Sequence, residues 1–275
     1  MKGVVFAAVL GAGVAAVQSP AAGQATAPPR AARIIAFSED LIEPEQHAAG
    51  LAARWAAQGH QVKFVAMTNR DVLNVSSGSA RQRAAEVLKC AHILGIEMEV
   101  VDIHPAELRP SRENRETVAR LLRQWQPDIV LSSRPYANRA IDALLPAAIV
   151  ESSVMPAPPR PRPVHLYYAD NLQPPPFDPA IVAGFDDVAD KKWQCIGVMP
   201  VPLPDLANIT DHEWHNTLVK DWKTRGVEIA NQYRERLVAL YGADRGRRIR
   251  YAERFEVSQT GRPATVEELL RLFPK

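Results

Sequence analysis

The chain has 275 residues and a formal net charge of +2, with 47% hydrophobic and 23% charged residues. This composition is that of a globular protein and excludes a disordered chain. The small net charge gives no reason to expect nucleic acid or an acidic surface as a partner.

The N-terminal region has the pattern of a bacterial-type export signal. Lys2 supplies a positive charge, residues 3–17 are apolar, and small residues at 21–23 follow where a signal peptidase would cut. The apolar run is short for a membrane span, and an uncleaved anchor is the alternative. We expect a signal peptide over 1–23, a linker over 24–32 and a periplasmic or secreted protein without a stable membrane span.

Strands alternate with helices from Arg33 onward. Short apolar runs typical of buried strands occur at 33–37, 62–67, 98–101, 128–132 and 163–168. Helical spacing of apolar residues occurs between them, at 45–58, 81–94, 112–125 and 140–150. We expect Pro146 to interrupt the last of these helices. The alternation predicts a doubly wound, mostly parallel α/β sheet of the Rossmann-like type.

The pattern changes after residue 169. Proline-rich stretches cover 171–179 and 199–204, where extended chain is expected. Further elements are predicted as a helix at 186–194, a long or broken helix at 210–241, a strand at 248–255 and a helix at 265–272. We interpret 33–275 as one domain that includes a helical C-terminal extension from about residue 205.

The two cysteines, Cys90 and Cys195, lie on predicted apolar or amphipathic segments. An oxidising compartment would allow a disulfide between them. Their spacing matches no metal or redox motif, so we interpret them as buried packing residues and leave their pairing open.

The carboxyl ends of the parallel strands form the expected functional edge, because ligands of such sheets bind there. The loop after the first strand is acidic, with Glu39, Asp40, Glu43 and Glu45. Carboxylates at this edge could hold a hard cation or act as acid and base. For Glu43 and Glu45 we favour a simpler role at the positive end of the first helix. Asp40 and Asp71 are expected to face the cleft.

The histidines offer no convincing metal site. His47 lies one helical turn after Glu43 and is interpreted as a surface residue of that helix. His165 lies inside a predicted strand and is expected to pack there.

Several segments resemble the LmbE-like (PIG-L) zinc-dependent de-N-acetylases, in their order and spacing. The family has a strand ending in A-H-P-D-D-x-E, a G-H-x-V strand and a T-N-G-D loop. The similar segments here are residues 34–40, 59–65, 68–71, 125–130, 163–168, 174–179, 186–192 and 251–256. The resemblance covers nearly all of the mature chain. It implies the doubly wound α/β fold, a zinc cofactor and hydrolysis of the N-acetyl group of a GlcNAc-type sugar or glycan.

The family's metal and catalytic residues carry over only in part. The ligand His falls on Phe37, whose ring cannot coordinate a metal. The general-base Asp falls on Glu39, and the ligand Asp falls on Asp40. The later histidine motif should lie within 133–139, which contains no histidine. A catalytic zinc normally needs three protein ligands, and of these only Asp40 remains.

Other polar and aromatic residues on the same loops are the expected substrate-binding residues. They are Arg70, Asp71, Arg134, Tyr136 and Asn138.

The sequence thus predicts an exported relative of the N-acetyl-sugar de-N-acetylases. Its zinc site is expected to be degenerate, with reduced or no hydrolysis, as in a pseudoenzyme. One alternative is an active amide hydrolase whose metal site is rebuilt around Glu39 and Asp40. Another is a non-catalytic carbohydrate-binding or interaction protein.

Overall fold

The fold is described from a computed structural model, over residues 30–40, 42–68, 80–135, 139–154, 159–169, 176–199 and 211–273. The predicted signal peptide and most of its linker lie outside these residues. Among the described helices, none has the length and apolar character needed to cross a membrane.

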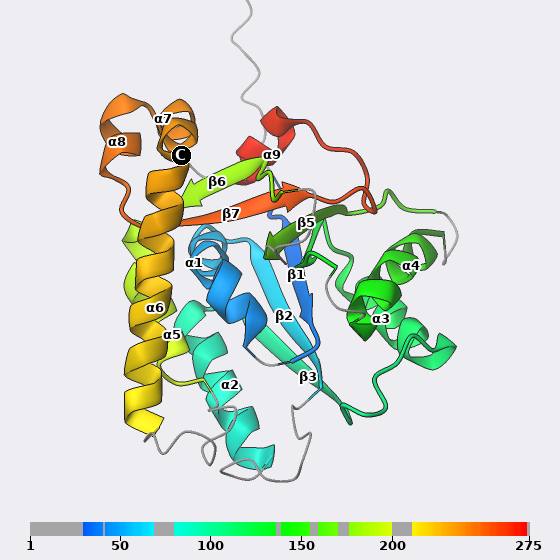
Figure 1. Cartoon of the computed structure of the whole chain (residues 1–275). Helices are drawn as coiled ribbons and strands as arrows, with labels where there is room; N and C mark the ends of the chain where they lie inside the picture. Colours follow the sequence, from blue (N-terminus) through cyan, green and yellow to red (C-terminus); the bar gives the residue numbers. More distant parts are fainter. Residues whose placement is uncertain are drawn as a thin grey trace, which may run out of the picture. The chain divides into compact units, whose positions relative to one another are not determined.

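Seven strands form one sheet in the order β3-β2-β1-β4-β5-β7-β6 (Figure 1). The strands are β1 (Arg33–Ser38), β2 (Gln61–Thr68), β3 (Glu97–Ile103), β4 (Ile129–Ser133), β5 (Val164–Ala169), β6 (Ile181–Gly184) and β7 (Ala252–Val257). The first five pair in parallel, whereas β7 is antiparallel to β5 and β6 is antiparallel to β7. The mostly parallel α/β sheet predicted from the sequence is confirmed.

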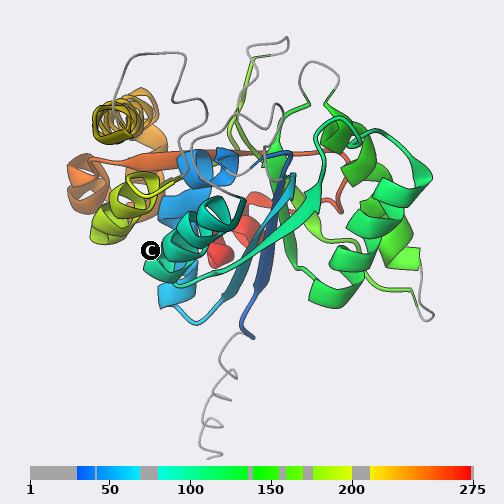
Figure 2. The same ribbon diagram turned by 90° about the horizontal axis from the view of Figure 1, so that it is seen from below.

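Helices cover both faces of this sheet (Figure 2). They are α1 (Glu43–Ala57), α2 (Ala80–Leu94), α3 (Arg112–Trp125), α4 (Ala140–Val154), α5 (Ala189–Ile196), α6 (Asp211–Gln232), α7 (Arg234–Tyr241), α8 (Ala243–Arg248) and α9 (Val266–Leu272), with a 3₁₀ turn η1 (Asp186–Val188). Helices α3 and α4 lie on one face, and α1, α2 and α5 lie on the other.

The alternation of side chains along β1 shows how the sequence builds these two layers. Ile34 and Ala36 pack in the core beneath α1 and α2, while Ile35 and Phe37 pack in the core beneath α3 and α4. Successive strand residues point to opposite faces, so a strand covered on both sides must be apolar at every position.

The prediction that Pro146 interrupts the fourth helix is wrong, because α4 continues through it to Val154. Leu144, Leu145 and Ala148, which flank the proline, are all buried. Their packing against the sheet outweighs the local cost of a proline inside a helix.

The C-terminal region is also not only helical. Its strand β7 lies between β5 and β6 and extends the main sheet. The sequence indicated a strand in this region but did not identify β6, which has only four residues. A run that short carries too little periodicity to be recognised.

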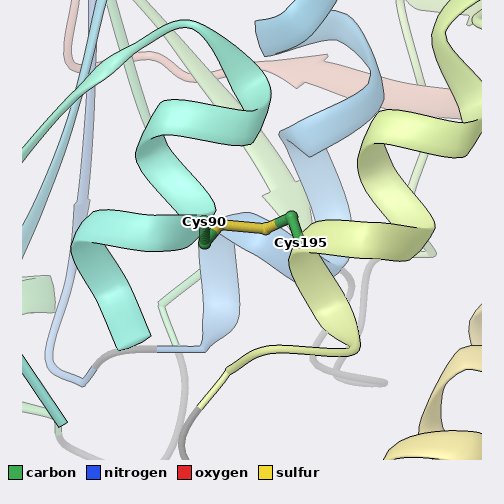
Figure 3. Close-up of a disulfide and its surroundings, with 2 residues drawn as sticks. All are labelled: Cys90 and Cys195. Carbon is green, nitrogen blue, oxygen red and sulfur yellow. A yellow bond between two sulfur atoms is a disulfide. The ribbon is translucent and has the colours of Figure 1, made fainter. Parts of the chain in front are cut away.

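The two cysteines form a disulfide that joins α2 to α5 (Figure 3). Both are completely buried, so they pack as expected and are in addition covalently linked. The pairing that the sequence left open is thereby defined, and it ties helices from two distant parts of the chain.

Candidate functional site at the switch point

The strand order reverses direction between β1 and β4. From β1 the chain continues outward through β2 and β3, and it then returns to β4 and β5 on the other side of β1. The loops that follow β1 and β4 therefore leave the sheet beside each other. In open α/β sheets this switch point is where ligands bind.

Arg139, from the loop after β4, is the central charge at this point. Its guanidinium donates two hydrogen bonds to the Glu43 carboxylate, from Nη1 to Oε1 at 2.9 Å and from Nη2 to Oε2 at 2.6 Å. It also donates to Ser133 Oγ at 2.9 Å, and its Nε lies 3.7 Å from Glu39 Oε2. Burial alone would lower the pKa of Arg139, but its hydrogen bonds with Glu43 raise the pKa above its ordinary value. Arg139 is therefore a permanent cation among carboxylates.

Glu39, at the general-base position of the family motif, faces this cluster. Its Oε1 accepts a hydrogen bond from the backbone N–H of Ile141, in the first turn of α4, at 3.2 Å. Its backbone carbonyl accepts from the N–H and hydroxyl of Thr68 at 2.9 and 2.8 Å, which ties the loop to the end of β2. The Glu39 side chain thus contacts the N-terminus of α4, an end of a helix where anions are favoured.

Asp40 follows in the same loop and is half-buried. Its backbone carbonyl accepts a hydrogen bond from Ser38 Oγ at 2.6 Å, and its Oδ1 lies 3.5 Å from the backbone nitrogen of Ile42. The turn between β1 and α1 is thus held by short local contacts, with Asp40 on its rim.

The side chain of Phe37, the residue on which the sequence resemblance places the family's histidine ligand, is completely buried. It belongs to the core beneath α3 and α4. Its backbone carbonyl accepts a hydrogen bond from the buried Tyr168 hydroxyl at 3.2 Å. Phe37 therefore serves as a packing residue and offers no donor atom from its side chain.

Glu45 differs from what the sequence led us to expect. Instead of facing solvent at the start of α1 it is completely buried, and neither carboxyl oxygen has a hydrogen-bond partner in another described residue. Burial raises its pKa well above the ordinary value of 4.5, and the negative charges of Asp40 and Glu43 raise it further. Glu45 therefore holds its proton more tightly than an exposed glutamate does. Glu43 also has a second role beyond the helix end, because it pairs with Arg139.

The side chains that the structure describes at this point do not form a zinc site. Within the described part of the chain, no group of three or more His, Cys, Asp or Glu residues could hold a metal ion. Phe37 supplies no ligand atom, and both oxygens of Glu43 are bonded to the Arg139 guanidinium. A catalytic zinc requires about three protein ligands, and this set does not fit it.

Arg134, a predicted substrate-binding residue, makes structural contacts. Its Nη2 donates to Glu256 Oε1 on β7 at 2.7 Å, and its guanidinium lies over the Phe177 ring, 5.6 Å from the centroid. Burial raises the pKa of Glu256, while the charge of Arg134 opposes this effect. These contacts fasten the loop after β4 to the C-terminal strand.

The other predicted substrate-binding residues lie outside the described residues. They are Arg70, Asp71, Tyr136 and Asn138. Their roles stay predictions from the sequence.

Two residues at the switch point were not recognised from the sequence. Arg139 lies in the segment 133–139, from which Arg134, Tyr136 and Asn138 were expected to bind substrate but Arg139 was not. Tyr168 ends a hydrophobic strand, and nothing in the sequence marks its contact with the backbone of Phe37. The sequence offered one signal for Arg139. It is a basic residue in a loop that the strand order places beside the acidic loop after β1.

Part of the chain matches a known protein family. Residues 45–142 match the family model described as PIG-L: GlcNAc-PI de-N-acetylase. The matched region contains β2, β3, β4 and most of α1, together with Arg139. The resemblance seen in the sequence is thereby confirmed. No curated protein matches the chain at the level of sequence.

Solved structures with the same fold come from several bacteria and an archaeon. N,N'-diacetylchitobiose deacetylase from Pyrococcus horikoshii has 19% identity and a TM-score of 0.61, over 84% of this chain and 85% of that one. GalB, the 4-carboxy-2-hydroxymuconate hydratase from Pseudomonas putida, has 18% identity and a TM-score of 0.64, over 85% and 98%. The conserved protein TT1542 from Thermus thermophilus has 20% identity and a TM-score of 0.62, over 83% and 94%. At these identities the likeness establishes the fold, and the fold alone does not choose between the reactions named.

Proposed function

We propose that this chain, whose residues 45–142 match the PIG-L family, is an exported de-N-acetylase relative that does not hydrolyse amides through a bound zinc. The bidentate pair between Arg139 and Glu43 is the observation that carries the proposal. An arginine at the switch point supplies the positive charge that a metal would supply, and it does so without an open coordination position or an activated water.

Two further features support the loss of the zinc centre. Phe37 is a core residue at a ligand position, so recovering a ligand there would require a polar group in a completely apolar site. Glu39 keeps a carboxylate at the general-base position, bonded to the start of α4. The site keeps part of the family's polar framework, which suits binding of an N-acetyl amino sugar or a glycan carrying one.

Export is the second part of the proposal. The pattern of residues 1–23 predicts a signal peptide, and the buried disulfide between Cys90 and Cys195 is a bond that persists in oxidising compartments. A periplasmic or secreted location accounts for both.

The test is metal analysis of the purified protein together with acetate release from N-acetylglucosamine and N,N'-diacetylchitobiose. We expect far less than one zinc per chain after incubation with zinc and removal of excess, and no acetate release above the uncatalysed rate. Phe37→His alone should not create activity, because the segment 133–139 still lacks a histidine.

Asp40→Ala serves as the comparison for metal binding and Glu235→Gln, a change at an exposed glutamate, as the control. One tightly bound zinc per chain that is lost in Asp40→Ala, accompanied by acetate release, would establish the alternative of a metal site rebuilt around Glu39 and Asp40. Saturable binding of N-acetylglucosamine without acetate release, weakened by Tyr136→Ala, would support a retained sugar site.

A further inference from the structure

A cavity lies between α1, α5, α6 and β7. Helix α6 runs alongside α5 and the end of β7 (Figure 1). The cavity has a volume of about 40 Å³, which is several times what one water molecule needs, so it can hold a group of a few heavy atoms. Its lining includes His47, Tyr168, Lys192, Trp222 and Arg225, which come from distant parts of the sequence.

A buried ion pair forms one side of the cavity. Lys192 Nζ donates to Glu253 Oε1 at 2.6 Å and to the backbone carbonyl of Gln46 at 2.7 Å, and both charged side chains are almost fully shielded from water. The Glu253 carboxylate also accepts from the backbone N–H groups of Gly50 and Leu51 at 2.9 and 2.8 Å. The charges of Lys192 and Glu253 thus offset each other, and the pair presents no net charge to the cavity.

Two arginines also line the cavity, and both have partners of their own. Arg254 is buried, donates to the Tyr233 hydroxyl at 3.0 Å and lies over the rings of Phe177 and Tyr233. Arg225 is exposed, and its Nη1 lies 3.6 Å from Glu228 Oε2 on the same helix. An anion in the cavity would have to compete with these contacts, so the arginines do not make it an anion site.

His47 supplies the cavity with a neutral hydrogen-bonding group. Burial, followed by the positive charges of the surrounding lysine and arginines, lowers its pKa to about 3, so the imidazole is neutral at physiological pH. The same positive charges disfavour a bound cation. A neutral imidazole has one N–H donor and one nitrogen acceptor. Neither ring nitrogen is hydrogen-bonded to another residue within the described part of the chain, so both are available to a neutral ligand.

Aromatic rings form the walls beside His47. The Trp222 ring contacts His47 edge-on, with ring centroids 4.6 Å apart, and His47 also stacks on Tyr168 with centroids 5.7 Å apart. The interpretation of His47 as a surface residue of α1 is therefore wrong, because these two distant residues pack against its ring. Flat apolar walls with a few polar groups between them are typical of a ligand pocket. They favour a flat group that carries both a polar and an apolar part.

We propose that this cavity binds the acetamido group of an N-acetyl amino sugar, with His47 as hydrogen-bond partner and Trp222 as the wall for its methyl group. The acetamido group is flat and neutral, has one donor and one acceptor, and ends in a methyl group. A sugar hydroxyl lacks the apolar part, and a free amine would bring a positive charge. The inference rests on the proposed function in taking an N-acetyl amino sugar as the ligand, but none of the described lining residues takes part in the Arg139 network.

Isothermal titration calorimetry on the purified protein tests this, with N-acetylglucosamine in one series and glucose in the other. We expect saturable binding of N-acetylglucosamine and at least about tenfold weaker binding of glucose, which lacks the acetamido group. His47→Phe keeps a flat ring but removes both nitrogens, and it should weaken the binding of N-acetylglucosamine about tenfold. Trp222→Ala should weaken it to a similar extent. Because Trp222 is partly exposed, this second variant keeps the test valid if His47→Phe does not fold.

His92→Phe is the matched control, because it makes the same exchange at an exposed histidine of α2 and should leave binding unchanged. Equal affinity for glucose and N-acetylglucosamine would overturn the inference, and so would an absence of saturable binding at millimolar concentrations. Binding that is lost in Tyr136→Ala but kept in both His47→Phe and Trp222→Ala would place the sugar on the loop after β4 and overturn it as well. The zinc content and the acetate release test the proposed function separately, whichever of these results is found.

Discussion

Two buried glutamates beside helix α1 behave in opposite ways. Glu45, in the first turn of α1, is completely buried and has no hydrogen-bond partner in another described residue. Glu253, on β7, is equally shielded but is bonded to Lys192 and to two backbone N–H groups of the same helix. Burial penalises the charged form of a carboxylic acid unless partners replace the lost water. Glu253 therefore has partners that replace the lost water, whereas burial without such partners raises the pKa of Glu45.

The surroundings of the two glutamates explain this difference. Glu45 lies near Asp40 and Glu43, whose negative charges raise its pKa further. Glu253 lies against Lys192 Nζ, at 2.6 Å, and accepts hydrogen bonds from the backbone N–H groups of Gly50 and Leu51.

The largest effect is expected when Glu253 loses its cation. Lys192→Met would leave a buried carboxylate with backbone partners only, and breaking such a pair typically costs about 3–5 kcal/mol. We expect a loss of about 4 kcal/mol in the free energy of unfolding, measured by urea denaturation at pH 7. Arg271→Met removes an exposed ion pair with Glu267 and should cost less than about 1 kcal/mol. Similar small losses in both variants would mean that Lys192 is not needed to offset the burial of Glu253.

The disulfide between Cys90 and Cys195 secures the same region, because Lys192 lies on α5 and the disulfide ties α5 to α2. The double variant Cys90→Ala and Cys195→Ala should lose about 3 kcal/mol of stability, since the unfolded chain regains the freedom that the link removes. Denaturant titration measures the loss. The thiol content checks the bond itself, because the native protein, unfolded without reductant, should show no free thiol. Two reactive thiols per chain under those conditions would disprove the disulfide.

The fold was largely predictable because it depends on local patterns. The first five strands and the helices between them were placed to within a few residues, since buried strands and amphipathic helices differ in period. Glu39 and Asp40 were placed at the functional edge by topology alone, because the carboxyl ends of parallel strands share one edge.

The chemistry of individual side chains was not predictable in the same way. His47 looks like a surface residue of a helix, but the distant residues Tyr168 and Trp222 pack against its ring. Glu45 looks the same in the sequence, but its side chain is completely buried. The partner of Glu43 is Arg139, 96 positions along the chain. A local pattern gives the face of a helix, whereas burial and charge pairing depend on what the rest of the chain places against it.

The smallest effect concerns Glu45, and it depends on pH. Because its pKa is raised in the folded state, the folded chain keeps a proton that the unfolded chain releases above about pH 4.5. The stabilising contribution is fully present below that value and is lost as the pH rises toward the raised pKa. The Glu45→Gln side chain is neutral at every pH. Between pH 4 and pH 8, the free energy of unfolding of this variant should rise by on the order of 1 kcal/mol relative to that of the natural chain. Glu235→Gln, at an exposed glutamate, should follow the natural chain across that range. Parallel curves of unfolding free energy against pH for Glu45→Gln and the natural chain would show that Glu45 finds a partner or water when it ionises. The energetic contrast between Glu45 and Glu253 would then be disproved, and only the difference in their hydrogen bonds would remain.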